Sequence, residues 1–377
     1  MDKTWVEINK KALKSNIHQF QKLVGRTDLM AVVKSNAYGH GLVEVAKIIN
    51  GVNPAFGGTS WFGVDSIDEA IKLKKAGINS PILILGYTLK SELKNVVKYN
   101  FRQIVYNKET ITELGKFKKK VKVHLKVETG TSRQGLEKEQ ILDFVKLIKK
   151  YPQIEIEGIY THFANIEDTT NYDFAEKQLN KFKETINLLE KNNIKIPIKH
   201  TACTAATILF PETYFNLVRV GIGIYGLWPS KETFVSAKNE HKKLILNPVL
   251  GWKTKIAQIK NIKAGTAISY GLTEKVFKNS KIAIIPVGYY DGYDRRLSGI
   301  GNVLIHGKRC KILGRICMNM TMIDVSHISN LKIEDEVVLI GVQNKEQITV
   351  DEIAQRIGTI NYEIVTRINP LISRIIK

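Results

Sequence analysis

Short apolar runs alternate with segments of helical spacing through the first 225 residues of the chain. Eight runs have the length of strands, at residues 29–33, 61–64, 81–85, 102–106, 121–127, 154–160, 196–200 and 217–220. Segments between them, such as 66–76, 137–150 and 172–191, place apolar residues three and four positions apart. Strands that alternate with helices form a parallel sheet covered on its faces. Eight such units predict an α/β fold with a (β/α)8 TIM-type barrel, and an open doubly wound sheet is the alternative.

The pattern changes in the last third of the chain, where many short strand-like runs are bounded by Gly and Asn. They lie at 249–257, 280–286, 301–305, 310–313, 321–325 and 336–339, and only 350–357 has the pattern of a helix, with Gly358 at its end. Many short strands indicate a separate, mostly-β C-terminal domain. We place the boundary in the charged stretch 231–248, which gives a barrel domain at 9–240 and a β domain at 241–377. The run 4–8, within residues 1–8, alternates like a strand and can be added to either domain.

The chain is strongly basic, with 57 Lys and Arg against 36 Asp and Glu and a formal net charge of +21. Lysine spread along the whole chain accounts for most of the excess, and no RNA- or DNA-binding signature accompanies it. We therefore expect no nucleic-acid partner, although a basic RNA-binding module is kept as a remote alternative. A positive field also suits an anionic small ligand.

Composition favours a cytoplasmic globular protein. Apolar residues make up 44% and charged residues 25%, near the average for folded domains. No apolar run is long enough for a membrane helix, and the first residues lack the core of a signal peptide. The three cysteines form neither a disulfide framework nor a zinc spacing. We expect no membrane association and no bound metal.

Polar residues follow the predicted strands at the end where barrel enzymes carry their chemistry. The clearest case is Lys34, which comes directly after the apolar run 29–33. A charge there is costly unless it reaches solvent, is paired, or is neutralised covalently, for example as an imine to an aldehyde cofactor. A rim lysine in an ion pair is the plain alternative.

A phosphate cradle is predicted after the last two strands of the barrel. Arg219 ends the eighth strand and is followed by Gly221 and Ile222, while Thr204 follows the seventh. The plain alternatives are a helix cap for Thr204 and a structural ion pair for Arg219. A lysine together with a phosphate cradle suggests pyridoxal phosphate.

Three other patterns carry weaker signals. The literal GxGxxG at 221–226 lies too late in the chain for a dinucleotide fold, which needs it after the first strand. His162 and His200 end neighbouring strands, so a shared site stays open, but hydrogen-bonded rim histidines are the simpler interpretation. Tyr270 and Tyr289 adjoin glycines in the second domain, where packing and acid–base chemistry are both possible roles.

The ordered set of motifs resembles the alanine racemases over essentially the whole chain. Residues 31–41, with the sequence AVVKSNAYGHG, look like the pyridoxal-phosphate attachment motif of that family. The other matching segments follow in order at 125–130, 133, 161–163, 218–222, 269–271, 288–292, 315–318 and 361–363. Any one of these motifs is modest evidence, whereas the ordered set is highly specific.

The resemblance implies a homodimer with shared active sites, bound pyridoxal 5'-phosphate and alanine as substrate. Lys34 would hold the cofactor and act as the base for one enantiomer, and Tyr270 of the partner subunit would serve the other. Arg219 would face the pyridine nitrogen with His162 behind it, and Arg133 would approach the phenolic oxygen and the substrate. The remaining implied positions are phosphate ligands at Tyr38, Thr204, Gly221, Ile222 and Tyr362, substrate contacts at Met318 of the partner subunit and Tyr289, and a carbamylated lysine at Lys126.

Arginine is always protonated and donates hydrogen bonds only, so Arg219 would keep the pyridine nitrogen unprotonated and limit side reactions such as transamination. A decarboxylase of the same barrel type would place a carboxylate there. The chain departs from the family pattern at Glu128, Thr204 and Asn319 and in the C-terminal segment 371–374. Asn319 stands where the family commonly has aspartate, and its neutral amide would alter the charge near the site for the substrate carboxylate.

We therefore expect interconversion of L- and D-alanine, which supplies D-alanine for peptidoglycan. Tyr362 favours alanine, because the serine-racemising relatives tend to vary there. A racemase of broader or serine selectivity and a cofactor-binding barrel without turnover are the alternatives.

Overall fold

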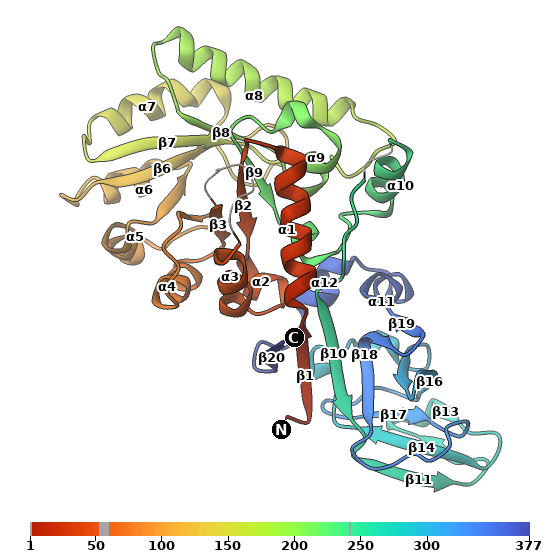
Figure 1. Ribbon diagram of the computed structural model, residues 1–377. Helices are drawn as coiled ribbons and strands as arrows, with labels where there is room; N and C mark the ends of the chain where they lie inside the picture. Colours follow the sequence, from red (N-terminus) through yellow and green to blue (C-terminus); the bar gives the residue numbers. More distant parts are fainter. Residues whose placement is uncertain (1, 53–59, 241–242) are drawn as a thin grey trace. The chain divides into compact units, whose positions relative to one another are not determined.

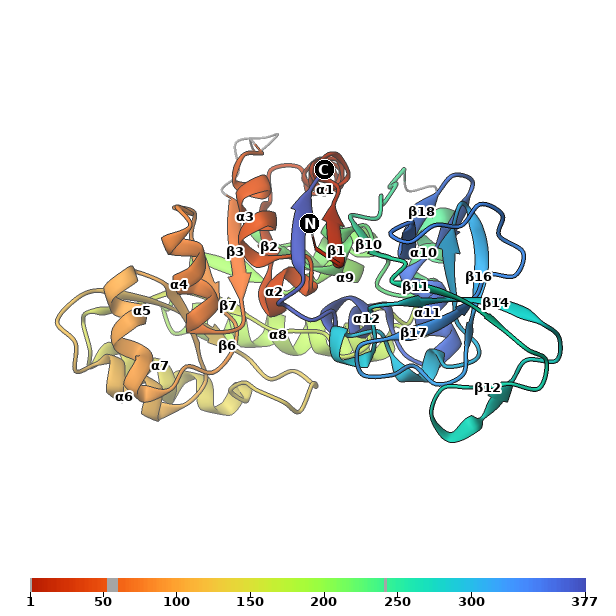
Figure 2. The same ribbon diagram turned by 90° about the horizontal axis from the view of Figure 1, so that it is seen from below.

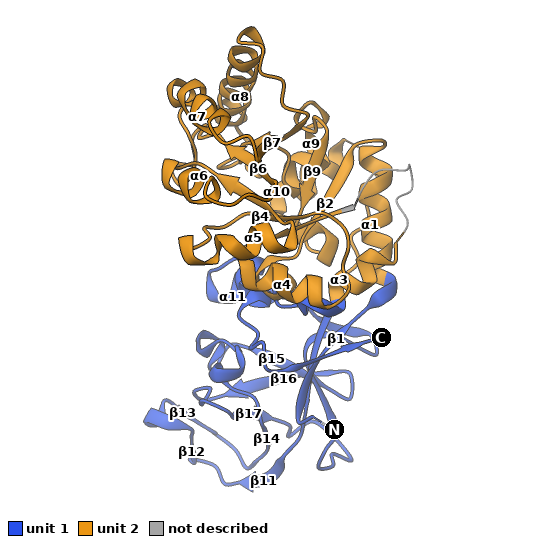
Figure 3. Cartoon of the chain, turned by 90° about the vertical axis from the view of Figure 1, so that its left-hand side faces the viewer, with its two compact units in different colours: residues 1–11, 38–44, 248–377 blue, residues 12–37, 45–247 orange. Residues whose placement is uncertain are grey.

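The computed structural model describes residues 2–52, 60–240 and 243–377. The chain forms two compact units, coloured separately in Figure 3. Unit 1 comprises residues 1–11, 38–44 and 248–377, and unit 2 comprises residues 12–37 and 45–247. The segment 38–44, which begins four residues after Lys34, thus belongs to unit 1. Residues 241 and 242, where the expected β domain begins, lie outside the described residues.

Unit 2 contains eight parallel strands in the described part of the chain, nearly closed into the predicted barrel (Figure 1). Their order is β8-β7-β6-β5-β4-β3-β2-β9. The backbone N–H groups of Asn216 and Arg219 donate to the oxygens of Lys199 and Ala202, at 3.1 and 2.9 Å, which links β9 to β8 across the gap. The strands are β2 (Asp28–Val32), β3 (Ser60–Val64), β4 (Ile82–Ile84), β5 (Arg102–Val105), β6 (Val121–Lys126), β7 (Ile154–Tyr160), β8 (Ile198–His200) and β9 (Leu217–Val220).

Helices connect these strands, and Figure 2 shows α4 to α7 outside the strands that they join. Local sequence sets their ends: the Ser66 side chain caps α4 and the Asn107 side chain caps α6 by accepting a backbone N–H. The charged stretch at 231–248 contains helix α10, which the sequence analysis did not expect. The helices are α1 (Lys10–Val24), α2 (Lys34–Tyr38), α3 (Leu42–Asn50), α4 (Ile67–Lys75), α5 (Leu93–Tyr99), α6 (Lys108–Leu114), α7 (Ile141–Lys149), α8 (Asp173–Lys191), α9 (Thr204–Leu209) and α10 (Lys231–Asn239).

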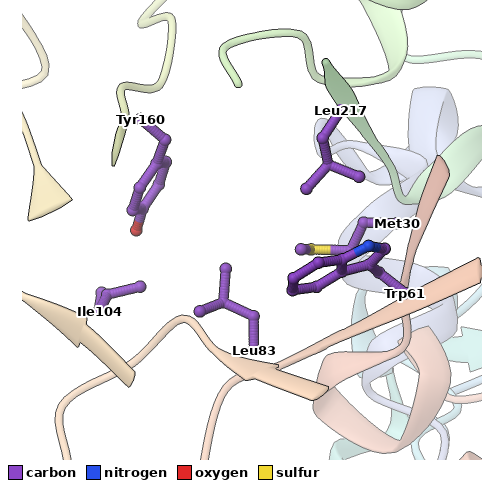
Figure 4. Close-up of a cluster of buried hydrophobic side chains, with 6 residues drawn as sticks. All are labelled: Met30, Trp61, Leu83, Ile104, Tyr160 and Leu217. Atoms are coloured by element: carbon purple, nitrogen blue, oxygen red, sulfur yellow. The ribbon is translucent and has the colours of Figure 1, made fainter. Parts of the chain in front are cut away.

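The side chains that point into the barrel form a buried cluster rather than a pore. Figure 4 shows its members, one from each of six strands: Met30, Trp61, Leu83, Ile104, Tyr160 and Leu217. Strands buried on both faces carry apolar residues at successive positions, as in β2 and β4.

Unit 1 is built on a twisted sheet in which the described strands follow the order β11-β14-β17-β16-β15-β18-β10-β1-β20, with β19 paired to β18. The N-terminal strand β1 (Thr4–Ile8) pairs antiparallel with β10 and parallel with β20, so it joins this sheet rather than the barrel. The other strands are β10 (Leu250–Lys255), β11 (Gln258–Ile262), β12 (Ala267–Ile268), β13 (Glu274–Lys275), β14 (Ser280–Ile285), β15 (Asn302–Ile305), β16 (Lys308–Leu313), β17 (Thr321–Asp324), β18 (Glu336–Gln343), β19 (Glu346–Ile348) and β20 (Ser373–Ile376).

Two helices accompany the sheet of unit 1. The predicted helix is confirmed as α11 (Val350–Ile357): the Thr349 hydroxyl accepts the Glu352 N–H at 3.0 Å, and Gly358 ends the helix at φ +70°. The second helix, α12 (Asn361–Thr366), was missed because it is short and its N-cap residue, Ile360, cannot supply a side-chain cap.

Candidate active site

Lys34 begins a left-handed turn that directly follows strand β2. Four successive residues have φ between +51° and +55°: Ser35, Asn36, Ala37 and Tyr38. This conformation costs roughly 1–2 kcal/mol for each residue with a side chain, and it occurs mainly where function requires it. Glu69 of α4 stabilises the turn by accepting the Asn36 N–H at 3.1 Å.

The Lys34 amine is accessible. Its side chain is 40% exposed, and Nζ lies 3.8 Å from Oδ1 of Asp65. Lys34 thus reaches solvent and is also paired, which are two of the three conditions under which the sequence allows a charge at this position. The ion pair predicted as the plain alternative is thus present, and the amine also remains open to a reactant.

Arg219 lies on β9 beside β2, in register with Met30, so its strand end neighbours that of Lys34. The side chain is 5% exposed. Nη1 donates to Nδ1 and the carbonyl oxygen of His200, at 2.8 and 3.0 Å. Nη2 donates to the carbonyl oxygens of Thr161 and Thr201, at 2.8 and 2.9 Å. In the described part of the chain, Nε–H is left as the donor without a protein acceptor.

Two histidines contact Arg219, and the closer one is His200 rather than His162, which the resemblance places behind the arginine. His162 Nδ1 lies 3.4 Å from Nη2, whereas His200 Nδ1 lies 2.8 Å from Nη1. His200 is closer because its strand, β8, adjoins β9 where the barrel closes. Burial, followed by the charge of Arg219, places the pKa of His162 well below its ordinary value, so the ring is neutral near pH 7.

Lys126 is 2% exposed and lies against Tyr160. Its Nζ is 4.4 Å from the centre of the Tyr160 ring, and Cζ of Arg219 is 5.0 Å from the same ring. Burial, then the charges of Arg219 and Arg133, holds the pKa of Lys126 well below its ordinary value. The lowered pKa favours the neutral, nucleophilic form of the amine.

Glu128 organises the loop that carries Arg133. Its carboxylate accepts the N–H groups of Gly130 at 2.5 Å, Thr131 at 2.6 Å and Arg133 at 3.2 Å. Burial alone would raise the pKa of this carboxyl, but the hydrogen bonds outweigh it and lower the pKa to about 2. Glu128 is one of the departures from the family pattern, and its ionised carboxylate holds the loop through these hydrogen bonds.

The predicted phosphate residues of unit 2 lie together. The Thr204 hydroxyl accepts the Gly221 N–H at 3.1 Å, so the plain interpretation of Thr204 as a helix cap is wrong. Ile222 begins the 3-10 helix η4 (Ile222–Tyr225), so its N–H lies outside the hydrogen bonds of that helix. The glycine pattern thus leads from the last barrel strand into a single 3-10 turn, which does not match a dinucleotide-binding unit.

In unit 1 the structure brings Tyr38 and Tyr362 together, with ring centres 6.0 Å apart. Gly39 is closely packed beside them, because a Cβ atom there would lie 1.9 Å from the Val365 oxygen. Nε and Nη2 of Arg374 donate to the Gly39 oxygen at 3.1 and 2.9 Å. The C-terminal segment 371–374, which departs from the family pattern, therefore retains Arg374. This arginine holds the chain next to Tyr38 through its hydrogen bonds to Gly39.

Three loops of unit 1 also meet, and they carry Tyr270, Tyr289 and Met318. The N–H of Tyr289 donates to the Cys317 oxygen, and the N–H of Tyr290 donates to the Met318 oxygen, each at 3.0 Å. A Cβ atom on Gly271 would lie 2.9 Å from the Arg315 guanidinium, which packs the Tyr270 turn onto the same loop. The Tyr270 side chain is nevertheless 71% exposed on its own chain, and Met318 is 54% exposed.

Several residues beside these groups were not predicted from the sequence: Asp65, Glu69, His124, Glu157 and Tyr160. None follows a strand end with a Gly-rich or lysine motif, so no local signal marks it. Among the described residues, no group of three potential His, Cys, Asp or Glu ligands is placed to hold a metal. The described helices also include none with the length and apolarity needed to cross a bilayer.

Comparison with known proteins gives the same family along the whole chain. The model of the alanine racemase N-terminal domain matches residues 8–229, and that of the C-terminal domain matches 249–376. The alanine racemase of Methanococcus maripaludis is 40% identical, with 98% of each chain covered, and that of Leptospira interrogans is 40% identical over 99% of this chain and 95% of its own.

Solved structures agree with the sequence relatives. The crystal structure of alanine racemase from Bacillus anthracis with bound L-Ala-P has a TM-score of 0.92 and 36% identity, covering 100% of this chain and 95% of that one. The alanine racemase of Clostridium difficile 630 has a TM-score of 0.92 and 33% identity, with 100% and 96% coverage.

Proposed function

Because the chain belongs to the alanine racemase family, we propose that it interconverts L- and D-alanine with pyridoxal 5'-phosphate by a two-base mechanism. The observation that carries this proposal is Arg219, a buried guanidinium beside the strand that leads to Lys34. Its two Nη groups are committed to protein acceptors, and Nε–H remains for a ligand. A donor-only group suits an unprotonated pyridine nitrogen.

The residues of unit 2 fit the cofactor. Lys34 supplies an accessible amine. Thr204 would offer its hydroxyl and Gly221 and Ile222 their backbone N–H groups to a phosphate, which would replace the hydrogen bond from Gly221 to Thr204. The cofactor, once bound through Lys34, withdraws electrons and makes the α-proton of the amino acid acidic. Tyr38 and Tyr362, which lie together in unit 1, are the other proposed phosphate ligands.

Two groups then move the α-proton on opposite faces of the substrate. Lys34 removes or returns it on one face, and Tyr270 of the partner subunit does so on the other. The exposure of Tyr270 on its own chain supports a role toward a second chain, and hence a homodimer with shared sites. Met318 of the partner subunit and Tyr289 would hold the substrate carboxylate.

Arg133 and Lys126 complete the proposed site. Arg133, placed by the Glu128 loop, would approach the phenolic oxygen of the cofactor and the substrate. A neutral Lys126 amine can add to carbon dioxide, forming an N–C bond and releasing one proton to solvent, and the negative carbamate would pair with Arg133 and orient it. His162 stays neutral behind Arg219.

We assign these roles to a barrel domain at 9–240 and a β domain at 241–377 of a cytoplasmic enzyme that makes D-alanine for peptidoglycan. Proton NMR of L-alanine in D2O with the cofactor-loaded protein, followed by chiral analysis, tests the reaction. We expect loss of the α-proton signal together with D-alanine. Exchange with serine but not alanine would replace the proposed substrate, and no exchange with any amino acid would reduce the protein to a cofactor-binding barrel.

Variants test the two bases. Lys34→Ala should remove racemisation and the absorbance of the bound cofactor, whereas Lys72→Ala, an exposed lysine of α4, should change neither. Tyr270→Phe should slow proton removal from one enantiomer about 10²-fold or more relative to the other. Equal, small losses from both enantiomers would refute the two-base assignment.

A further inference from the structure

A line of four buried side chains runs through the interior of the barrel from Arg219. Nη1 of Arg219 meets Nδ1 of His200 at 2.8 Å. Nε2 of His200 meets Nδ1 of His124 at 2.9 Å, and Nε2 of His124 meets Oε2 of Glu157 at 3.2 Å. The four residues come from β9, β8, β6 and β7, and both imidazoles are fully buried.

The two ends of this line fix the direction of every hydrogen bond. Arginine only donates, an ionised carboxylate only accepts, and a neutral imidazole has one donor and one acceptor. His200 Nδ1 therefore accepts from Arg219, and its Nε2–H donates to His124. His124 Nε2–H in turn donates to Glu157. Only one tautomer of each ring satisfies all three bonds.

Protonation of either ring would break the line. In a His200 imidazolium, Nδ1–H would face the N–H donor of Arg219, so two donors would meet. In a His124 imidazolium, Nδ1–H would likewise face the Nε2–H donor of His200. Burial is the largest cause that lowers the pKa of both histidines, and the charge of Arg219 acts in the same direction. Both rings are therefore held neutral.

Aromatic packing fixes the rings in place. His200 stacks on Tyr160, with ring centres 4.8 Å apart and planes 2° apart. His124 and Trp61 pack edge to face, with ring centres 5.7 Å apart. Figure 4 shows that Tyr160 and Trp61 enter the barrel interior from different strands. The imidazoles thus have little freedom to turn away from Arg219.

The far end of the line is anchored by charge. Glu157 accepts from Nε of Arg102 at 3.0 Å and from Nζ of Lys122 at 2.7 Å. Burial alone would raise the pKa of Glu157, but hydrogen bonds from His124, Arg102 and Lys122 lower it well below its ordinary range. The carboxylate therefore stays ionised, and consecutive hydrogen bonds along the line polarise one another toward it.

We propose that His124, with Glu157 behind it, is a positioning residue that acts through His200 to hold the Arg219 guanidinium in one orientation, with Nε–H turned to the ligand. The positioning is a property of the folded chain, whereas its consequence for the reaction rests on the proposed function. No proton needs to travel along the line; its role is to fix which donor Arg219 presents.

Histidine NMR tests the assignment directly. In protein labelled with ¹⁵N-histidine and loaded with cofactor but given no substrate, His124 and His200 should both appear as neutral Nε2–H tautomers between pH 6 and 8. An imidazolium or an Nδ1–H tautomer at either residue would overturn the proposal. This readout does not depend on turnover, so it stands even where alanine proves to be the wrong substrate.

Variants test the consequence for Arg219. In Glu157→Gln the amide oxygen still accepts from His124, so the tautomers should persist while the N–H signals of both rings shift. His124→Gln should shift the His200 signals and the absorption maximum of the bound cofactor, and lower kcat about 10-fold with KM for alanine nearly unchanged. The matched control is His18→Gln, an exposed histidine of α1.

If both variants have the same histidine and cofactor spectra and the same kcat as His18→Gln, the line is structural only. That result would overturn the proposal. Where His124→Gln does not fold, Glu157→Gln and the tautomers of the unaltered protein decide the matter.

Discussion

Within unit 2, Lys126 and Arg219 are buried and held against Tyr160 inside a single barrel, whereas Tyr270 and Met318 of unit 1 stand exposed on loops. The buried residues have their orientation fixed by contacts within their own unit. Backbone hydrogen bonds hold the loops next to Tyr270 and Met318. The side chains of these two residues are nevertheless mostly exposed on their own chain. Burial and internal contacts thus orient the charged side chains of unit 2, whereas the exposed side chains of unit 1 remain available to another molecule.

Complementation between two inactive variants gives the largest expected effect. Lys34→Ala and Tyr270→Phe should each lower racemisation about 10²-fold or more. Co-expressed together, they should form mixed dimers with one intact site, which restores about a quarter of the unaltered activity. The measurement is the racemisation rate of the purified mixture.

The control pairs two variants of the same unit, Lys34→Ala and Arg219→Lys, whose mixed dimers contain no intact site. Recovery with this pair, or no recovery with the first, would contradict the division of the site between chains.

Gly39→Ala tests how the segment after Lys34 is held in unit 1. Gly39 has φ +81°, and a Cβ atom there meets the Val365 oxygen, so strain and overlap should together destabilise the fold by about 2–5 kcal/mol. Gly358→Ala, at φ +70° with open space around it, should cost about 1–2 kcal/mol. Urea unfolding measures both, and equal losses would mean that the close packing at Gly39 contributes nothing.

The smallest expected effect concerns acid stability in unit 2. The pKa of Glu128 is about 2 in the folded chain against an ordinary 4.5, so the unfolded chain takes up its proton first as the pH falls. The stabilisation is fully present well above pH 4.5 and is lost as the pH falls to 2, a change of about 3 kcal/mol. Glu128→Gln should therefore lower the unfolding free energy at pH 7 and flatten its decline between pH 4.5 and 2.

Exposed Glu176→Gln, in α8, is the control for this titration. An unchanged slope in Glu128→Gln would assign the acid sensitivity to other carboxyls, of which Glu157 is the first to examine.

Several parts of the fold and site were predictable because their signals are local. Strands such as β2 and β4 are short apolar runs because both of their faces are buried, and Lys34 comes just after the first of them. Helix α11 is predictable because Thr349 caps its start and Gly358 follows its last residue. The N-terminal strand was visible as an alternating run, but its partners β10 and β20 lie at the other end of the chain.

The sequence by itself determined the element order, the rim of the barrel where polar residues gather, and the family to which the chain belongs. Tertiary structure alone decided that His200 lies closer to Arg219 than His162 does, and that His124 and Glu157 stand behind it. These contacts join residues 19 to 76 positions apart, so no local periodicity records them. Barrel closure creates them, because it brings the inward faces of separate strands into a shared interior where every donor must find an acceptor.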